Sequence, residues 1–451
     1  MDPLKRLVLF LFLFPLFAWG QNLKGSVLNS QNKLAIQDVN IALKETNENT
    51  TTDDKGSFKL KVSKNLEQSD TLYVSHIGYT PKKISFFDLK KNNYLIFLDE
   101  KMENLNGLTL SSTKREFKSK LNFIKLAPLQ YRISSFGSVI KDNKIYVIGG
   151  DGSFKTDALK KLQYEKPDFT MNDYIKELQF QFSGQYYKGN LLIYDIKNNL
   201  WETSKIKFRK RAYHNLNLYN NTIYVLGGKR VSVNGKFEYL EDKIEVFDTN
   251  KETVTIDNTN PHQAADFASF TYNGTIITMG GSIKMSENGS KKFTNKVHSY
   301  DINSGYWYEL TDMPTAKEVN GVLIKDKIYL VGGFNGKALS SFESFDLVTE
   351  TWKNEGELFN TLGYPAITHK DDVIYIFENE KMYTLDINSK ELKEYLINLP
   401  FKGSKLYYCD DKLYLIGGYL DNYYSQYPSS GLYSIEISEF ENTKPNRVKI
   451  L

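Results

Sequence analysis

The chain has 451 residues, more than one ordinary hydrophobic core accommodates, so several domains or an array of repeats are expected. Its 31 tyrosines and 28 phenylalanines stand in short runs with valine and isoleucine, and turn-forming pairs separate these runs. This pattern predicts an all-β protein. The formal net charge of +4 is small and the lysines are mixed with acidic residues, so the sequence does not support nucleic-acid binding.

Residues 1–20 have the layout of a secretory signal peptide. Lys5 and Arg6 form a basic start, an apolar run covers 7–17, and small residues follow before Gln21. This layout predicts export with cleavage before Gln21, and an uncleaved membrane anchor is the alternative. The apolar run is short for a bilayer span, and the mature chain is expected to hold no stable membrane span. The expected location is the periplasm, the outer-membrane surface or the extracellular space.

Cys409 is the single cysteine, so the chain cannot form an internal disulfide. An exported protein without disulfides must be held together by packing, which suits a bacterial envelope better than eukaryotic secretion. The five histidines show no metal-ligand spacing, and neither a metal site nor a cofactor is expected.

Residues 22–112 predict a small β-sandwich. Strand-like runs alternate with turns, and the turn at 54–56 precedes Phe58, Leu60 and Val62, which alternate to one face. Roughly five to seven such strands in a segment of this length are typical of a sandwich. A linker is expected to follow over 113–120.

A series of short motifs occurs in order through this first region. They are Gly25 and Val27, Val39, Thr52-Asp53 with Gly56-Ser57-Phe58, and Leu72-Tyr73-Val74-Ser75 before Ile77-Gly78-Tyr79. With these motifs the region resembles the carboxypeptidase regulatory-like domain. The resemblance implies a non-catalytic module of the kind found at the front of exported envelope proteins of Bacteroidetes-type bacteria, and the chain has no His-x-x-Glu zinc pair.

Five apolar runs between 145 and 418 each end on a pair of glycines. The first four are followed, after a loop of variable length, by a strand-like segment that ends in an aromatic residue and aspartate. A tryptophan or valine stands seven positions after that aromatic residue. Constant spacing beside variable loops indicates a repeat. The repeated glycines and tryptophans are Gly149, Gly150, Gly227, Gly228, Gly280, Gly281, Gly332, Gly333, Gly417, Gly418, Trp201, Trp307 and Trp352.

These units resemble kelch repeats. With a degraded unit at 364–398, they imply an all-β architecture in which the small β-sandwich is followed by a six-bladed kelch-type β-propeller over 121–451. A strand at 121–126 is expected to complete the last blade, and the C-terminal segment 447–451 is the alternative. The blades are expected at about 136–206, 212–258, 266–312, 319–356, 364–398 and 404–440.

The glycine pairs are interpreted as structural. A phosphate-binding glycine loop leads into a helix N-terminus, whereas here another strand follows. Residues without a Cβ let the second strand leave the sheet, and they leave room for the large aromatic residue of the same unit. Trp201, Trp307 and Trp352 are expected in the core between blades.

One face of the propeller is expected to bind the ligand, because its connecting loops vary most. The first blade inserts 151–190, with a short helix expected around 171–179, and the last has a tyrosine-rich loop at 419–431. Tyrosines stack on sugars or anchor protein partners, and arginines can hold a carboxylate in the central mouth. Ordinary loop packing and surface salt bridges are the alternatives. The candidate ligand-binding residues are Arg132, Arg211, Arg230, Tyr419, Tyr423, Tyr424 and Tyr427.

The sequence favours binding over catalysis, and no catalytic residue is assigned. The copper oxidases that share this architecture need a Cys–Tyr cross-link and two histidine ligands, for which the chain shows no pattern. A carbohydrate-active enzyme of the sialic-acid mutarotase type, which needs an acid–base pair in the mouth, is the alternative. A structural component of the envelope is the third interpretation. The leading interpretation is an exported protein whose propeller binds a glycan or an envelope or surface protein.

Overall fold

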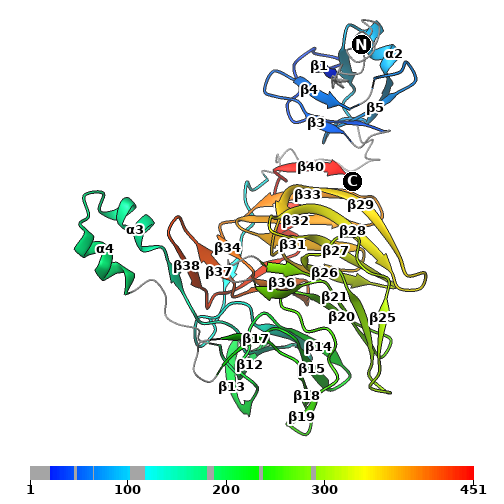
Figure 1. Cartoon of the computed structure of the whole chain (residues 1–451). Helices are drawn as coiled ribbons and strands as arrows, with labels where there is room; N and C mark the ends of the chain where they lie inside the picture. The colour runs from blue at the N-terminus through cyan, green and yellow to red at the C-terminus, as the bar shows by residue number, and fades with distance from the viewer. Residues whose placement is uncertain are drawn as a thin grey trace, which may run out of the picture. The chain divides into compact units, whose positions relative to one another are not determined.

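The computed structural model describes residues 21–44, 48–63, 65–101, 117–179, 187–232, 237–285 and 291–451 (Figure 1). The expected signal peptide and half of the expected linker, 113–116, lie outside these residues. The chain divides into two compact units: the residues up to 115 with 447–449 form the first, and residues 116–446 with 450–451 form the second. None of the described helices is long and apolar enough to span a membrane.

The first unit is a β-sandwich with sheet orders β4-β1-β7 and β3-β2-β5-β6. Alternate residues of β4 point inward, so that Phe58, Leu60 and Val62 join the hydrophobic core. The Asp53 carboxylate accepts hydrogen bonds from the backbone N–H groups of Lys55 and Ser57 and fixes the turn before β4. The elements are β1 (Gln21–Asn29), β2 (Asn40–Leu43), β3 (Asn49–Thr51), β4 (Ser57–Val62), β5 (Thr71–Ser75), β6 (Lys82–Ser85), α2 (Phe86–Lys91) and β7 (Leu95–Leu98).

The second unit is a propeller of six antiparallel sheets, each of which is one blade (Figure 1). Blade one is β9 (Gly137–Lys141), β10 (Lys144–Ile148), β12 (Asn190–Asp195) and β13 (Leu200–Lys207), and blade two is β14 (Asn215–Tyr219), β15 (Thr222–Leu226), β18 (Ile244–Asp248) and β19 (Thr253–Asp257). Blade three is β20 (Ala268–Tyr272), β21 (Thr275–Met279), β24 (Val297–Asp301) and β25 (Trp307–Leu310). Blade four is β26 (Glu318–Ile324), β27 (Lys327–Phe334), β28 (Leu339–Asp346) and β29 (Thr351–Leu362). Blade five is β30 (Ala366–Lys370), β31 (Val373–Glu378), β32 (Lys381–Asp386) and β33 (Glu391–Leu396), and blade six is β35 (Lys405–Cys409), β36 (Lys412–Ile416), β39 (Leu432–Glu436) and β8 (Ile124–Lys125). The last strand of the chain is β40 (Arg447–Ile450).

Further short elements lie in the connections. They are β11 (Lys155–Thr156), α3 (Ala158–Glu165), α4 (Met171–Leu178), β16 (Lys229–Val231), β17 (Glu238–Leu240), β22 (Ser282–Met285), β23 (Lys291–Phe293), β34 (Phe401–Lys402), β37 (Tyr419–Asp421), β38 (Ser425–Pro428) and α5 (Ser438–Asn442).

The first strand of each blade lies innermost. β9 is beside β14, β14 beside β20, β20 beside β26, β26 beside β30, and β30 beside β35. Residues of all six first strands line one channel, with a volume of about 330 Å³. The hydrophobic clusters lie between neighbouring sheets, for example where residues of blades two and three pack together. Each blade therefore depends on its neighbours for its core.

The last blade takes its fourth strand from the N-terminal side of the propeller. β8 pairs with β39, so that Ile124 lies opposite Ser434 and Lys125 opposite Tyr433. The expected alternative, closure by the C-terminal segment, is wrong. The residues on either side of 447–449 instead lie along blade five, since the N–H of Asn446 donates to Glu394 O at 2.7 Å and the N–H of Leu451 donates to Lys390 O at 2.9 Å.

The glycine pairs of blades one, two, three and six contact the loop that enters the next blade. All ten glycines have φ between 60° and 112°, where residues with a Cβ are strained. The N–H of Gly228 in blade two donates to Ala264 O, just before blade three, at 2.8 Å. A Cβ on Gly227 would lie 2.5 Å from the Phe267 ring of blade three. In these four blades the side chain over the first glycine comes from the next blade, not from the same unit as the sequence predicted, whereas Gly332 of blade four meets the backbone of its own blade.

The three repeat tryptophans stack on aromatic residues of their own blades. The Trp201 and Tyr194 ring centroids are 5.0 Å apart, and Trp307–Tyr300 and Trp352–Phe345 have the same arrangement. Each indole N–H also reaches the preceding blade. Trp201 Nε1, for instance, donates to Ala127 O, just after β8, at 2.8 Å. The tryptophans therefore lie at the joints between blades.

Blade five shows how a blade forms without the glycine pair. β31 continues to Glu378 and turns at once through Asn379 and Glu380 into β32, so no long loop leaves the sheet. The Glu378 carboxylate accepts hydrogen bonds from the N–H groups of Gly363 and Tyr364 in the loop that leads into the blade. This carboxylate thus ties blade five to its own entry loop, while the N–H of Asn379 donates to Phe401 O, just before blade six, at 2.9 Å.

Candidate functional site

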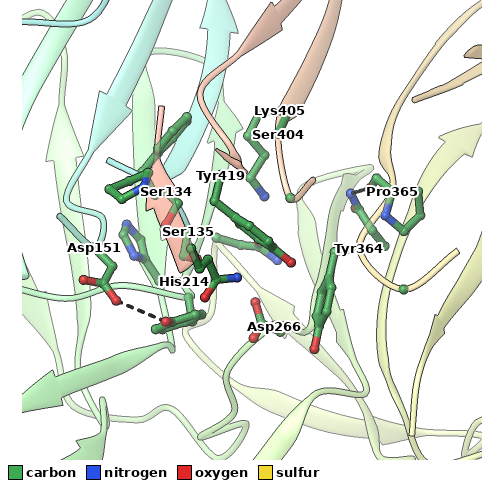
Figure 2. A pocket seen from close by; sticks show the side chains of 18 of the residues that line it. Ser134, Ser135, Asp151, His214, Asp266, Tyr364, Pro365, Ser404, Lys405 and Tyr419 are labelled. Carbon is green, nitrogen blue, oxygen red and sulfur yellow. Dashed lines mark hydrogen bonds between the residues drawn. The ribbon is translucent and has the colours of Figure 1, made fainter. Parts of the chain in front are cut away.

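Loops from all six blades surround a cavity of about 340 Å³ at one end of the channel (Figure 2). These loops lead into the first strand of a blade or leave its second strand. Asn215, Asn320 and Lys405 line both the cavity and the channel, so the two are continuous. We call this cavity the mouth. Its charged and aromatic lining includes Asp151, Tyr213, Asp266, Tyr364, Lys405 and Tyr419.

Backbone hydrogen bonds hold the residues that enter the first four blades around the mouth. The N–H of Tyr213 donates to Ser135 O at 2.7 Å, and the N–H of Asp266 donates to Tyr213 O at 3.1 Å. The N–H of Val319 continues the series to Asp266 O at 3.2 Å. Ser135, Tyr213 and Asp266 have φ between 52° and 62°, which is uncommon for residues other than glycine. The surrounding structure therefore over-determines their conformation, as at many functional sites.

Asp266 faces the mouth from the loop before blade three (Figure 2). Burial raises the pKa of its carboxyl to about 7, and Glu318 acts in the same direction. Lys291, Lys229 and Lys405 act against this shift. Within the described part of the chain, the Asp266 carboxylate has no hydrogen-bond or ion-pair partner.

Lys405 reaches the mouth from the first residue of β35 in blade six. Blades three and six are three positions apart in the ring of six, so Lys405 and Asp266 enter from opposite sides of the axis. Burial lowers the pKa of Lys405, against the attraction of Asp266. Its ammonium group likewise has no partner among the residues that the structure describes.

The other acidic groups at the mouth have partners. Glu318 accepts a hydrogen bond from the Tyr364 hydroxyl at 2.9 Å and pairs with Lys291 at 2.6 Å. Asp151 accepts hydrogen bonds from the Tyr213 hydroxyl at 3.1 Å and from the backbone N–H of Ser153 at 2.8 Å. These contacts hold Tyr213 and Tyr364 at the mouth.

A lateral module lies beside the mouth, built from connections of two blades. β11 of the blade-one insertion pairs with β38 of blade six, in a sheet with the order β11-β38-β37-β34. The helices α3 and α4 project from this sheet (Figure 1). We call α3 and α4 with the turn between them, residues 158–178, the helical hairpin. The sequence predicted α4 but not α3.

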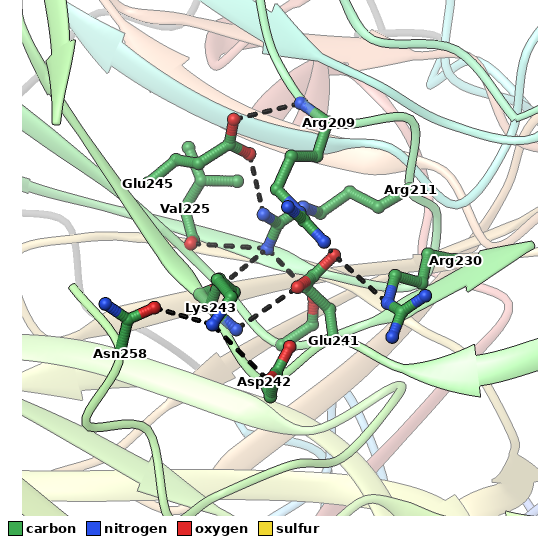
Figure 3. A network of polar contacts seen from close by, with 10 residues as sticks. Arg209, Arg211, Val225, Arg230, Glu241, Asp242, Lys243, Glu245 and Asn258 are labelled. Atoms are coloured by element: carbon green, nitrogen blue, oxygen red, sulfur yellow. Dashed lines mark hydrogen bonds and ion pairs between the residues drawn. The ribbon is translucent and has the colours of Figure 1, made fainter. Parts of the chain in front are cut away.

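Arg211 does not line the mouth, contrary to the sequence prediction. Its side chain is fully buried and Nη2 pairs with Glu245 at 2.6 Å (Figure 3). Nη1 donates to the backbone oxygens of Val225, Gly227 and Lys243. Burial lowers the pKa of Arg211, against the attraction of Glu245. Arg211 therefore ties the entry of blade two to its sheet.

The other two arginines do not meet at the mouth either. Arg132 is exposed and lies outside the mouth lining. Arg230 lies in β16, with its guanidinium 4.9 Å from the Tyr239 ring centre and Nε 3.8 Å from Glu241 Oε2. It lines a separate groove between the connections of blades two and three. The predicted arginine site for a carboxylate does not form.

The four predicted tyrosines separate into three environments. Tyr419 lines the mouth. Tyr424 and Tyr427 hold the lateral module together: the Tyr424 hydroxyl donates to Glu165 at 2.6 Å, and Tyr427 stacks on Phe154. The Glu165 contact raises the pKa of Tyr424 to about 12. Tyr423 is 67 % exposed.

Two family models match the chain. The CarboxypepD_reg-like domain covers residues 23–110, and the KLHDC2/KLHL20/DRC7 Kelch-repeats domain covers 180–377. The chain carries a kelch-repeat domain. With the six blades, this makes the second unit a kelch-type propeller, and kelch domains are protein-interaction modules.

Several kelch proteins are similar to part of the chain. Kelch-like protein 40 of Xenopus tropicalis is 27% identical over 143 residues, which are 28% of this chain and 23% of that protein. An F-box/kelch-repeat protein of Arabidopsis thaliana is 27% identical over 135 residues, 29% of this chain and 31% of that protein. Kelch-like protein 15 of Mus musculus is 25% identical over 181 residues, which are 36% of this chain and 29% of that protein. The chain thus spans less than a third of the length of these relatives.

Sequence reasoning missed Tyr213, Asp266, Tyr364 and Lys405 in the mouth of the kelch propeller. All four stand at or just before the start of a first strand, a position that recurs once per repeat. That recurrence was the available signal, but the residue type differs from blade to blade. The structure also shows no cluster of three or more histidine, cysteine, aspartate or glutamate side chains placed to hold a metal, within the described residues.

Proposed function

We propose that this chain is an exported interaction protein whose kelch propeller binds a protein partner beside the mouth. The observation that carries the proposal is the apolar surface of the helical hairpin. Met171, Ile175 and Leu178 lie on one face of α4 and are 71 %, 52 % and 39 % exposed. Although the structure describes all of α4, none of its residues is buried.

An isolated helix of eight residues is not stable in water, so contacts other than core packing must hold α4. A capping box of Thr170 and Asp173 begins the helix. Lys166 pairs with Asp173 at 2.9 Å and Lys161 pairs with Glu177 at 2.7 Å. These polar contacts fix α4 on α3 and leave its apolar face available to a partner.

The charges of the lateral module favour an apolar partner surface. Residues 155–178 hold five lysines and five acidic residues, so the segment has no net charge. Beside it, Tyr164 is 70 % exposed and lies 6.2 Å from Tyr423, measured between ring centroids. A neutral, apolar and aromatic surface is typical of the centre of a protein interface.

The test is capture of a partner by cross-linking in the envelope of the source cells, followed by binding measurements with the purified partner. Ile175→Lys and Met171→Lys are expected to weaken binding at least about tenfold each, because they place a charge in an apolar interface. Val348→Lys is the matched control, since Val348 is 72 % exposed in blade four. Unchanged binding by both α4 variants would contradict the proposal.

Export is the second part of this proposal, supported by the layout of residues 1–20. The mature protein isolated from cells is expected to begin at Gln21, which N-terminal sequencing checks. A chain that keeps its first twenty residues would contradict cleavage and favour the membrane anchor.

A glycan ligand is the second candidate, favoured by the exposed rings of Tyr164 and Tyr423. Exposed tyrosine rings stack on sugar faces. A glycan array with the wild type and with Tyr423→Ala tests this candidate. Binding that Tyr423→Ala abolishes would support it, and anomer exchange of sialic acid would instead support the mutarotase alternative. If the protein shows neither glycan binding nor anomer exchange and is stably incorporated into an envelope complex, the structural component is favoured.

A further inference from the structure

Two charged side chains of opposite sign face the mouth without partners in the described part of the chain. Asp266 enters from blade three and Lys405 from blade six (Figure 2). They do not pair with each other, since their charged atoms are not within ion-pair distance. Cavity space therefore separates a carboxylate from an ammonium group.

The remaining charges near Asp266 are already engaged. Glu318 pairs with Lys291 and accepts a hydrogen bond from the Tyr364 hydroxyl. Lys229 pairs with Glu238 at 3.7 Å and lies 5.1 Å from the Tyr213 ring centre. Among the described residues, no second group is left to neutralise Asp266 or Lys405 in their present positions.

Partly desolvated charges without partners cost free energy. The pKa values show this cost, since burial raises the pKa of Asp266 to about 7 and lowers that of Lys405. Both shifts favour the neutral form of the group. A ligand that supplied the two missing opposite charges would remove both costs at once.

We propose that the mouth binds a small zwitterionic ligand of the amino-acid type, with its ammonium group at Asp266 and its carboxylate at Lys405. This site is separate from the partner surface on the helical hairpin and goes beyond the proposed function. A ligand with one charge fits less well. A lone carboxylate at Lys405 is opposed by the charge of Asp266, and a lone ammonium at Asp266 is opposed by the charges of Lys405 and Lys291.

The size and walls of the mouth fit such a ligand. A volume of about 340 Å³ lies at the lower end of the range for small-molecule sites. Tyr364 and Tyr419 give aromatic walls for the apolar part of the ligand, and Tyr364 is held by stacking on Phe334. The backbone of Asp266, with φ of 53°, is held at the mouth by hydrogen bonds with Tyr213 and Val319 before the ligand arrives.

Calorimetric titration of the mature full-length chain with the twenty amino acids, one at a time, tests the proposal. At least one amino acid is expected to bind. Its N-acetyl derivative, which lacks the ammonium, and its amide, which lacks the carboxylate, are each expected to bind at least about tenfold more weakly. Glucose and N-acetylneuraminic acid serve as neutral and anionic sugar probes.

Two variants make the test specific to the assigned residues. The Asp266→Asn variant should bind the amino acid and its N-acetyl derivative with similar affinity. The Lys405→Met variant should bind the amino acid and its amide with similar affinity. Lys251→Met, in an exposed turn of blade two, is the control and should bind as the wild type does. Urea unfolding shows whether each variant is folded.

Three outcomes would overturn the proposal: no amino acid binds, a sugar probe binds more tightly than any amino acid, or both variants keep the wild-type preference. The partner surface is assayed separately with the α4 variants. A failure at the mouth therefore leaves the proposed function standing, and a failure at α4 leaves the mouth proposal standing.

Discussion

At Gly228, a Cβ atom would lie 2.4 Å from Ala212 O, and φ is 81°. Two separate constraints therefore act on this residue, the left-handed backbone and the close approach of another chain segment. Gly305 isolates the first constraint, because its φ is 74° but no atom lies within 4 Å of its Cβ position. The comparison of the two glycines separates backbone strain from contact.

Gly305→Ala is expected to destabilise the protein by about 1 kcal/mol, from backbone strain. Gly228→Ala is expected to cost about 3 kcal/mol or more, because the backbone of the loop that enters blade two must also move. Urea unfolding of the two variants measures the difference. Equal costs would show that the close contact at Gly228 relaxes freely.

Asp266 is expected to make stability depend on pH. Its pKa is about 7 in the folded protein and 3.8 in the unfolded chain, so the folded state holds the proton between these values. This carboxyl therefore contributes stability at low pH that is lost as pH rises from about 4 to about 7, at about 1.4 kcal/mol per pKa unit.

Urea midpoints at pH 5 and pH 8 check this dependence with Asp266→Asn. The variant should lose less stability than the wild type between the two pH values, since asparagine does not ionise. Asp54→Asn, in an exposed turn of the sandwich, should keep the wild-type profile. A wild-type profile in Asp266→Asn would show that this carboxyl is not the group responsible.

At the scale of elements, the repeat spacing of the sequence predicts the strands of the blades well. It does not predict the lateral module, because β11 has two residues and pairs with β38 about 270 positions away. A strand so short has no alternation that a local pattern can detect.

The sequence predicted Arg211 at the mouth, whereas its side chain is buried in an ion pair with Glu245. Glu245 lies in another strand, so no local pattern around Arg211 reveals this pair. Lys317 and Glu343 repeat this pairing in blade four, and that recurrence was the missed signal.

Arg211→Met is expected to destabilise blade two by about 3–5 kcal/mol, because it leaves the buried Glu245 carboxylate without its charged partner. The backbone oxygens of Val225, Gly227 and Lys243 also lose their donor. Arg132→Met is the matched control, since Arg132 is exposed, and its effect should stay within about 0.5 kcal/mol. Urea unfolding distinguishes this structural role from the ligand-binding role that the sequence suggested.

At the scale of the whole molecule, the segment 117–130 connects three blades. The N–H of Leu121 donates to Leu396 O in blade five at 2.9 Å, and the N–H of Leu126 donates to Leu432 O in blade six at 2.9 Å. Ala127 O accepts from Trp201 of blade one. Since every blade packs on its neighbours, loss of this segment should expose core on both sides of the last blade.

A chain of residues 117–451 is expected to melt as the propeller of the full chain does, because the sandwich is a separate compact unit. A chain of residues 127–451 is expected to melt at least about 10 °C lower, since it loses β8 and the buried Leu121, a loss of several kcal/mol. Differential scanning calorimetry compares the two. Equal melting temperatures would mean that the ring of blades is stable without the β8–β39 pair. The remaining contacts between blades six and one, such as the close approach of Gly417 to the Phe136 ring, would then be sufficient to close the ring.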